Sequence, residues 1–165
     1  MSDSTPLNCY RTIVGADWID VNGHMNAQHY YTVVYRAHVV LTERLGLGDA
    51  YVAARQCGKV VVESHHRFER ELRLNDPLEV RSRLLGVDAK RLHFFHEIWN
   101  ARDGYRAGTG EQIDVHVDLR TRRGAPFAPD VRARLQAVAD AHAALPRPPG
   151  AGFFDARMKP LAGKR

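Results

Sequence analysis

The chain has 165 residues, of which 44% are hydrophobic and 26% are charged. This balance suits one globular domain with a real core and excludes a disordered or fibrous protein. The net charge of +5 and the pI near 9.5 admit an anionic partner. Because the basic residues are scattered, they favour a small phosphorylated ligand and make nucleic acid an unlikely partner.

Neither the start of the chain nor its apolar residues predict membrane association. No apolar run reaches the ~20 residues of a membrane helix. The polar first residues lack the basic and apolar segments of a signal peptide. The two cysteines, Cys9 and Cys57, have no metal-ligand spacing. These features predict free thiols in a cytoplasmic protein.

The N-terminal part of the chain predicts a strand and then a long helix. Residues 9–18 are rich in β-branched and aromatic side chains, which is typical of a strand. A polar turn containing Gly23 follows, and Asn26 is suited to cap a helix. Apolar residues then recur at helical spacing up to Leu45, and the glycines of 46–48 end the helix.

The rest of the chain predicts four strands and a short helix. The four strand segments are 58–73, 78–89, 90–101 and 105–120. Residues 129–145 return to helical spacing. Because strands joined by short turns form an antiparallel sheet, this order predicts an α+β domain. Its five-stranded antiparallel sheet wraps around the long helix.

The chain divides into three regions: an N-terminal extension over 1–8, one domain over 9–146, and a loosely held Pro/Gly-rich tail over 147–165. Apolar residues on the outer face of the sheet would need cover. A second copy of the chain is the simplest cover, in a homodimer or a dimer of dimers. These residues include Val61, Leu84 and Val115.

The stretch 17–31, DWIDVNGHMNAQHYY, places an acid, a Gly-His turn, an Asn and an aromatic-rich helix start in succession. This pattern resembles the 4-hydroxybenzoyl-CoA-thioesterase-like branch of the hotdog fold, whose element order also matches. Within the branch, the chain looks like the betainyl-CoA thioesterases. The further matching motifs are DAKRLHFFHE (88–97), EQ (111–112), HVD (116–118) and AHAALP (141–146).

The resemblance implies an acyl-CoA thioesterase that uses no cofactor beyond its CoA thioester substrate. The substrate would be betainyl-CoA or another short or aromatic acyl-CoA. Asp20 matches the catalytic acid and would attack the thioester carbon or activate water. Free amides at the helix start beside Asn26 would stabilise the oxyanion, and His24 would orient Asp20 or the substrate. An ordinary turn, cap and structural histidine are the alternatives.

A betainyl group carries a quaternary ammonium, which aromatic faces and a nearby acid can hold. Trp18, beside Asp20, is the first choice for a substrate wall. The other candidates near the substrate are His29, Tyr31, Glu63, His65, Trp99 and Glu111. The candidates for the phosphates of CoA are Lys90, Arg91, Arg120, Arg122 and Arg123. Core aromatics, edge acids and solvated turn charges are the ordinary alternatives.

No metal site is expected. His65 and His66 are adjacent on a strand, so their side chains point to opposite faces of the sheet, and His93 and His96 share this defect. Two other functions stay open. One is a hotdog hydratase or dehydratase, and the other is a non-catalytic binder of CoA esters or nucleic acid.

Overall fold

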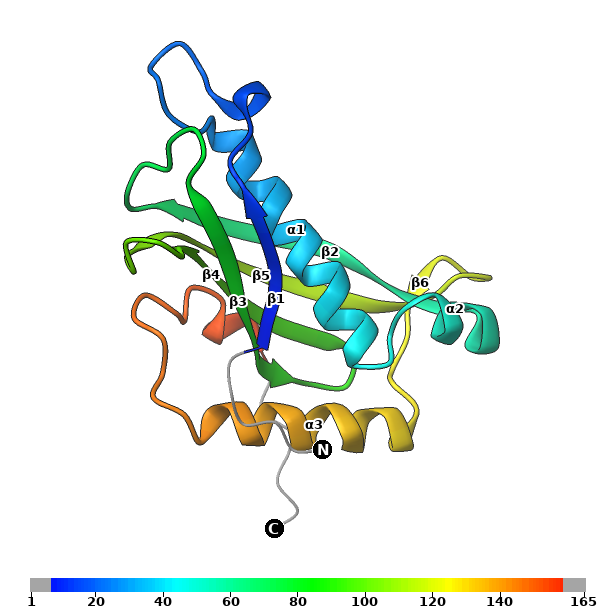
Figure 1. Ribbon diagram of the computed structural model, residues 1–165. Helices are drawn as coiled ribbons and strands as arrows, with labels where there is room; N and C mark the ends of the chain where they lie inside the picture. The colour runs from blue at the N-terminus through cyan, green and yellow to red at the C-terminus, as the bar shows by residue number, and fades with distance from the viewer. Residues whose placement is uncertain (1–6, 159–165) are drawn as a thin grey trace.

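The computed structural model describes residues 7–158, which form one sheet with helices packed around it (Figure 1). The strands are β1 (Leu7–Ile13), β2 (Cys57–Phe68), β3 (Pro77–Val87), β4 (Arg91–Asn100), β5 (Arg106–Asp118) and β6 (Arg123–Gly124). The helices are α1 (Ala27–Arg44), α2 (Asp49–Arg55) and α3 (Pro129–Ala143), with two 3-10 turns at Ala16–Trp18 and Asp155–Arg157.

The strands lie in the order β1-β3-β4-β5-β2, with the two-residue β6 beside β5, and every pair is antiparallel. The long helix α1 lies across one face of this sheet (Figure 1). The predicted α+β class, with five main strands around one long helix, is therefore confirmed.

Two predicted strand ends are wrong, and one helix was missed. The first strand ends at Ile13, because the backbone turns into a 3-10 helix before Trp18. The second ends at Phe68 rather than at 73. Helix α2 was not predicted, since seven residues are too few to show a helical period. Of the expected extension over 1–8, residues 1–6 lie outside the described part, and Leu7 already belongs to β1.

Helix α1 packs on the sheet through a buried apolar face. Its buried apolar residues are Tyr30, Val33, Val34, Ala37 and Leu41. Gly110 of β5 allows the close approach, since a Cβ there would lie 2.9 Å from Cγ1 of Val34. The N-terminus of α1 is thus held at one place beside the sheet.

A buried polar network lies in the same interface. Nε2 of His38 on α1 is 2.9 Å from Oδ2 of Asp114 on β5, and Nζ of Lys59 on β2 is 3.3 Å from the same oxygen. Oγ of Ser82 is 2.7 Å from Nδ1 of His96, whose ring centroid is 5.6 Å from that of His38. Four strands and α1 therefore share one set of polar contacts.

Burial sets the charge state of this network. It lowers the pKa of His38, although Asp114 opposes the change. Complete burial lowers the pKa of His96 well below its ordinary value, and His38 adds to the effect. Burial alone would raise the pKa of Asp114, but His38 and Lys59 outweigh it and lower that pKa. A buried carboxylate and a half-buried ammonium thus lie beside neutral histidines.

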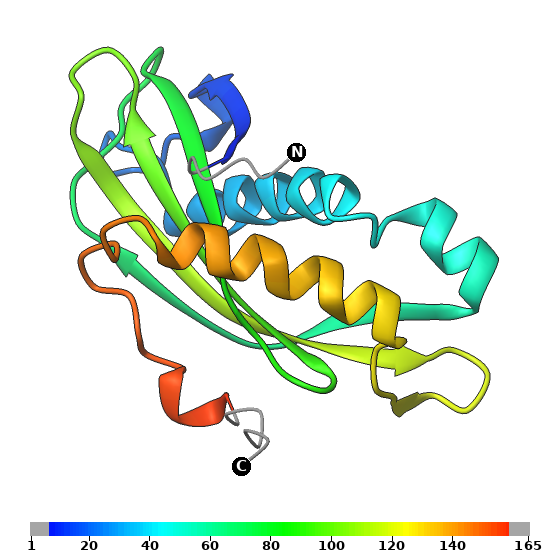
Figure 2. The ribbon, with the colours of Figure 1, turned by 90° about the horizontal axis from the view of Figure 1, so that it is seen from below.

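The C-terminal segment, residues 147–158, crosses the sheet on the side opposite α1 (Figure 2). Glu111 of β5, only 1% exposed, accepts hydrogen bonds from the backbone N–H groups of Gly152 at 3.1 Å and Phe154 at 3.2 Å. Its Oε1 also lies 2.6 Å from Nε2 of His93. Burial would raise the pKa of Glu111, but these hydrogen bonds outweigh burial and lower it.

The expectation of a loosely held tail is therefore wrong for residues 147–158, and residues 159–165 lie outside the described part. The outer face also needs less cover than expected. Leu84 belongs to the core, and the C-terminal segment covers part of the face that was assigned to a second copy. Among residues 7–158, no helix is long and apolar enough to cross a membrane.

Acid should destabilise the fold from about pH 6.5 downward. The pKa of His96 is ordinary, about 6.5, in the unfolded chain and lower in the fold, so the unfolded state binds more protons below that pH. The stabilisation is complete above pH 6.5 and is lost as pH falls toward the folded pKa. The free energy of unfolding should fall by about 1.4 kcal/mol per pH unit for each such proton.

His96→Asn keeps an acceptor for Ser82 but cannot be protonated, so its stability should depend less steeply on pH, by about one proton. Denaturant unfolding between pH 5 and pH 7.5 measures this slope. The slope should stay above zero in this variant, because burial also lowers the pKa values of His38 and His66. An unchanged slope in His96→Asn would contradict the assignment.

Glu111→Ala should release the C-terminal segment and lower the free energy of unfolding by about 2–4 kcal/mol, because it leaves His93 and two N–H groups without their acceptor. Hydrogen exchange at Gly152 and Phe154 should quicken. The control is Glu63→Ala, which removes an exposed 3.1 Å ion pair between Glu63 and Arg157 on the same segment and should cost at most about 1 kcal/mol. Equal losses in the two variants would rule out the anchoring role.

Candidate functional site

Asp20 lies in a tight turn just before α1. Gly23 N donates to Asp20 O at 3.0 Å, and Asn22 N donates to Asp20 Oδ1 at 2.8 Å. Gly23 has φ +79, a conformation that favours glycine. The carboxylate is 18% exposed, and its Oδ2 makes no hydrogen bond among the described residues. The turn thus holds an ionisable oxygen open to an incoming molecule.

The start of α1 leaves one backbone donor unused. Asn26 caps the helix as predicted: its side chain accepts from Gln28 N at 3.0 Å, and its carbonyl accepts from His29 N at 3.0 Å. Ala27 N has no hydrogen-bond partner within residues 7–158. The expected set of free amides at the helix start therefore narrows to the Ala27 N–H, where the helix carries partial positive charge.

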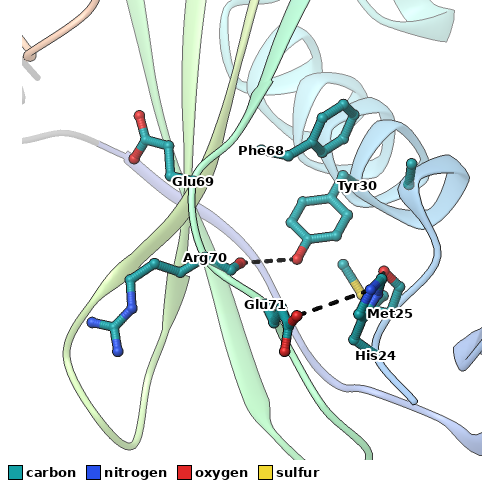
Figure 3. A pocket seen from close by; sticks show the side chains of 8 residues that line it. His24, Met25, Tyr30, Phe68, Glu69, Arg70 and Glu71 are labelled. Carbon is teal, nitrogen blue, oxygen red and sulfur yellow. Dashed lines mark hydrogen bonds and ion pairs between the residues drawn. The ribbon is translucent and has the colours of Figure 1, made fainter. Parts of the chain in front are cut away.

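A cavity of about 330 Å³ opens beside this N–H (Figure 3). Its lining residues are His24, Met25, Ala27, Tyr30, Phe68, Glu69, Arg70 and Glu71. The hydroxyl of Tyr30 donates to the carbonyl of Arg70 at 3.1 Å, and burial raises the pKa of Tyr30 to about 12. The cavity lies between the first turn of α1 and the chain that leaves β2.

His24 connects Asp20 with this cavity. Its Nδ1 lies 3.8 Å from Asp20 Oδ1, and its Nε2 lies 4.0 Å from Glu71 Oε1 on the far wall (Figure 3). Nδ1 is also 3.3 Å from the carbonyl oxygen of Met25. The acid, the histidine and the free N–H therefore all lie near the start of α1.

The aromatic residues expected as substrate walls do not line the cavity. Trp18 stacks on His29, with ring centroids 5.0 Å apart and planes 8° apart. Tyr31 points from an exposed side of α1 toward His66. Trp99 faces the outer side of β4, where the guanidinium of Arg81 lies 4.6 Å from its ring centroid.

Three other expected substrate residues lie on the outer face of the sheet. Glu63 pairs with Arg157 and His65 stacks on Phe153, both of which belong to the C-terminal segment. Glu111 anchors that segment rather than facing a substrate. The placement of Glu63 also removes the hydratase alternative, which needs His24 and Glu63 on one substrate. His65 and His66 contact opposite sides of β2, as the strand period requires.

The expected CoA-binding residues gather at the other end of the sheet. Arg91 pairs with Asp88 at 2.7 Å, and Arg120 pairs with Asp118 at 2.8 Å. The remaining three are exposed and make no ion pair in the described part of the chain: Lys90, Arg122 and Arg123. In the same part, no group of three or more His, Cys, Asp and Glu side chains is arranged to hold a metal ion.

Sequence reasoning missed Phe68 and Glu71 as lining residues and placed Tyr30 only in the core. Phe68 is an aromatic side chain at the end of a strand, and 58% of it is exposed. The signal available in the sequence was an aromatic residue directly before the charged run of residues 69–73. Its contact with Tyr30, 38 residues away in the chain, becomes visible only in the fold.

Comparisons with known proteins show the family to which the chain belongs. Residues 14–135 match the family model described as "Thioesterase-like superfamily". A betainyl-CoA thioesterase from Pseudomonas aeruginosa is 38% identical over 149 residues, which cover 90% of this chain and 94% of the relative. A Rhizobium meliloti protein named L-carnitine dehydrogenase/betainyl-CoA thioesterase is 37% identical over 90% of this chain, which spans only 30% of that relative.

Among solved structures, a hypothetical protein from Staphylococcus aureus in complex with CoA has a TM-score of 0.80 at 22% identity. The match covers 90% of this chain and 94% of that protein. At this identity the likeness supports the hotdog fold and carries no argument about activity.

Proposed function

The chain belongs to the thioesterase-like superfamily of thioester hydrolases, and we propose that it hydrolyses betainyl-CoA to betaine and CoA. One observation carries the proposal beyond the relatives: one cavity is lined both by Ala27, whose N–H is free, and by His24, which lies 3.8 Å from Asp20. Thioester hydrolysis needs an attacking oxygen and a donor for the developing oxyanion, and Asp20 and the Ala27 N–H would supply them.

Asp20 acts in one of two ways. As a general base, its carboxylate takes a proton from water, and the water oxygen attacks the thioester carbon. As a nucleophile, it attacks that carbon itself, and water then hydrolyses the mixed anhydride. Both routes expel the CoA thiolate and need no cofactor. His24, 3.8 Å from Oδ1 of Asp20, orients the carboxylate toward the cavity.

The Ala27 N–H stabilises the charge that develops on the thioester oxygen. It is free because Ala27 is the first residue of α1, so no carbonyl lies one helical turn before it. A backbone donor on a capped helix needs no reorganisation during the reaction, which makes its stabilisation of the oxyanion effective. Asn26 therefore contributes by holding the helix start and does not itself line the cavity.

We propose a homodimer joined at β2. Within residues 7–158, β2 pairs only with β5, so its other edge is open. The exposed apolar residues beside this edge are Val60 and Val62 on β2 and Tyr31, Tyr35 and Val39 on α1. An open strand edge flanked by apolar side chains can pair with another strand. A second copy related by a two-fold axis would cover both the open edge of β2 and these apolar side chains.

This arrangement also gives a role to the basic turns. Phe68 pairs with Gly108 and Cys57 with Asp118, so the cavity and the turn after β5 lie roughly 35 Å apart along the strands of one chain. If two β2 strands pair antiparallel, the basic end of one chain lies beside the cavity of the other. The free cations of the partner, at positions 90, 122 and 123, would then bind the phosphates of CoA.

The function is tested by CoA release from betainyl-CoA, measured with a thiol reagent beside a panel of neutral acyl-CoAs. Wild type should release CoA, and Asp20→Asn should lower kcat by about 10²–10⁴-fold, because a positioned acid–base group contributes that much. If no acyl-CoA releases CoA, the proposed thioesterase function is wrong. If Asp20→Asn turns over as fast as wild type, only the assignment of Asp20 is wrong.

Ala27→Pro removes the N–H and leaves the helix intact. Proline is favoured at the first helical position, and Asn26 before it has an extended backbone, with ψ 142, that tolerates a following proline. We expect kcat to fall by about 10²–10³-fold at unchanged thermal stability. Ala27→Ser keeps the N–H and should stay within a few-fold of wild type. Full activity in Ala27→Pro would exclude this donor.

Val62→Glu places a charge on the open edge of β2 and should convert the dimer to a monomer, as measured by light scattering after gel filtration. The control is Leu74→Glu, which alters an exposed apolar side chain away from that edge and should leave the dimer intact. A wild-type monomer, or a dimer that survives Val62→Glu, would contradict this interface.

A further inference from the structure

Two aromatic rings form a corner in the cavity beside α1. The rings of Tyr30 and Phe68 stand at 89° to each other, with centroids 5.2 Å apart. Tyr30 is buried, whereas 58% of Phe68 is exposed at the rim. A quaternary ammonium cannot donate hydrogen bonds, and aromatic rings attract it through their electron-rich faces. A corner of two rings suits such a group better than a single wall.

The charges around this corner are negative. Glu69 is already paired, since both of its oxygens lie 2.8 Å from the guanidinium of Arg106. Glu71 has a weaker partner, an exposed Arg73 at 3.3 Å, and its carboxylate points across the cavity toward His24 (Figure 3). Glu71 is thus the carboxylate most available to a ligand.

Among residues 7–158, no guanidinium or ammonium group competes for this position inside the cavity. Arg70 contributes only its backbone there, because its guanidinium lies over the ring of Tyr105, 3.8 Å from the centroid (Figure 3). Its carbonyl oxygen faces Tyr30 and accepts a hydrogen bond from the hydroxyl. The cavity therefore combines aromatic faces, a carbonyl oxygen and a carboxylate.

We propose, on the basis of the function proposed above, that Phe68, Tyr30 and Glu71 hold the trimethylammonium head of the acyl group. A single methylene separates this head from the thioester carbon of betainyl-CoA. The head must therefore lie close to the oxyanion donor, and Ala27 lines the same cavity as the aromatic corner. Trp18, the wall expected from the sequence, stacks on His29 outside this lining.

The matched substrate is 3,3-dimethylbutanoyl-CoA, in which a carbon replaces the nitrogen and removes the charge at nearly equal shape. Wild type should show a higher kcat/KM for betainyl-CoA than for this isostere. Phe68→Leu and Glu71→Gln should each lower kcat/KM for betainyl-CoA by about 5- to 20-fold, and for the isostere by less than about 2-fold. Both side chains are exposed, so the fold should tolerate these changes.

Two controls separate this subsite from general damage. Glu69→Gln removes the neighbouring, paired carboxylate and should change kcat/KM for both substrates by the same factor. Trp18→Leu should do so as well. If Phe68→Leu and Glu71→Gln also lower kcat/KM for both substrates equally, the subsite is overturned while betainyl-CoA hydrolysis stands.

A binding experiment judges the subsite without the reaction. Tetramethylammonium chloride, titrated into the full chain, should shift the ring resonances of Tyr30 and Phe68 in NMR spectra. The shifts should weaken at least 5-fold in apparent affinity in Glu71→Gln. Absence of these shifts in wild type overturns the subsite, whether or not betainyl-CoA is hydrolysed. Shifts in a protein that releases no CoA keep the subsite and overturn only the proposed function.

Discussion

The docking of α1 on the sheet is the constraint on which the rest of the site depends. The donor at Ala27 is useful only if the helix start stays at one place, and contacts far from the site provide that. His38, eleven residues further along α1 and about 16 Å away by helical rise, meets Asp114 and Lys59 in the core. Sliding the helix would take His38 away from Asp114 and cost the buried carboxylate a hydrogen bond. The polar network therefore favours one register of α1 among those that the apolar face would allow.

The sequence predicted the parts of the site that are close together in the chain. The Asp20 turn, the Asn26 cap and the helix that follows are encoded within ten residues, and each depends on local chemistry. The β-strand period also correctly placed His65 and His66 on opposite faces. These predictions needed no knowledge of which distant segments meet.

Apart from the strand ends and the short helix α2, the failed predictions concern contacts between residues that are distant in the chain. Glu111 meets the backbone of residues 152–154, about forty residues later, and nothing local indicates that a buried carboxylate will anchor a Pro/Gly-rich tail. The aromatic corner joins Tyr30 to Phe68 across two elements. Trp18 was preferred because it neighbours Asp20 in sequence, yet its ring turns toward His29. Neighbourhood along the chain therefore did not indicate which aromatic side chains line the cavity.

The charge distribution suits a substrate whose two ends differ in sign. The net charge is +5, yet the described side chains that reach into the cavity beside α1 include carboxylates and no guanidinium or ammonium group. The unpaired cations expected to bind CoA lie at the far end of the strands. CoA presents phosphates, whereas a betainyl group presents a cation, so a single basic surface would attract one end and repel the other. In each chain the basic residues and the acidic cavity lie at opposite ends of the sheet, which avoids this repulsion. In the proposed dimer, the basic end of one chain would lie beside the cavity of the other. The open edge of β2 is where such a pairing would occur, so the proposed dimer and the proposed preference for a cationic acyl group depend on the same geometry.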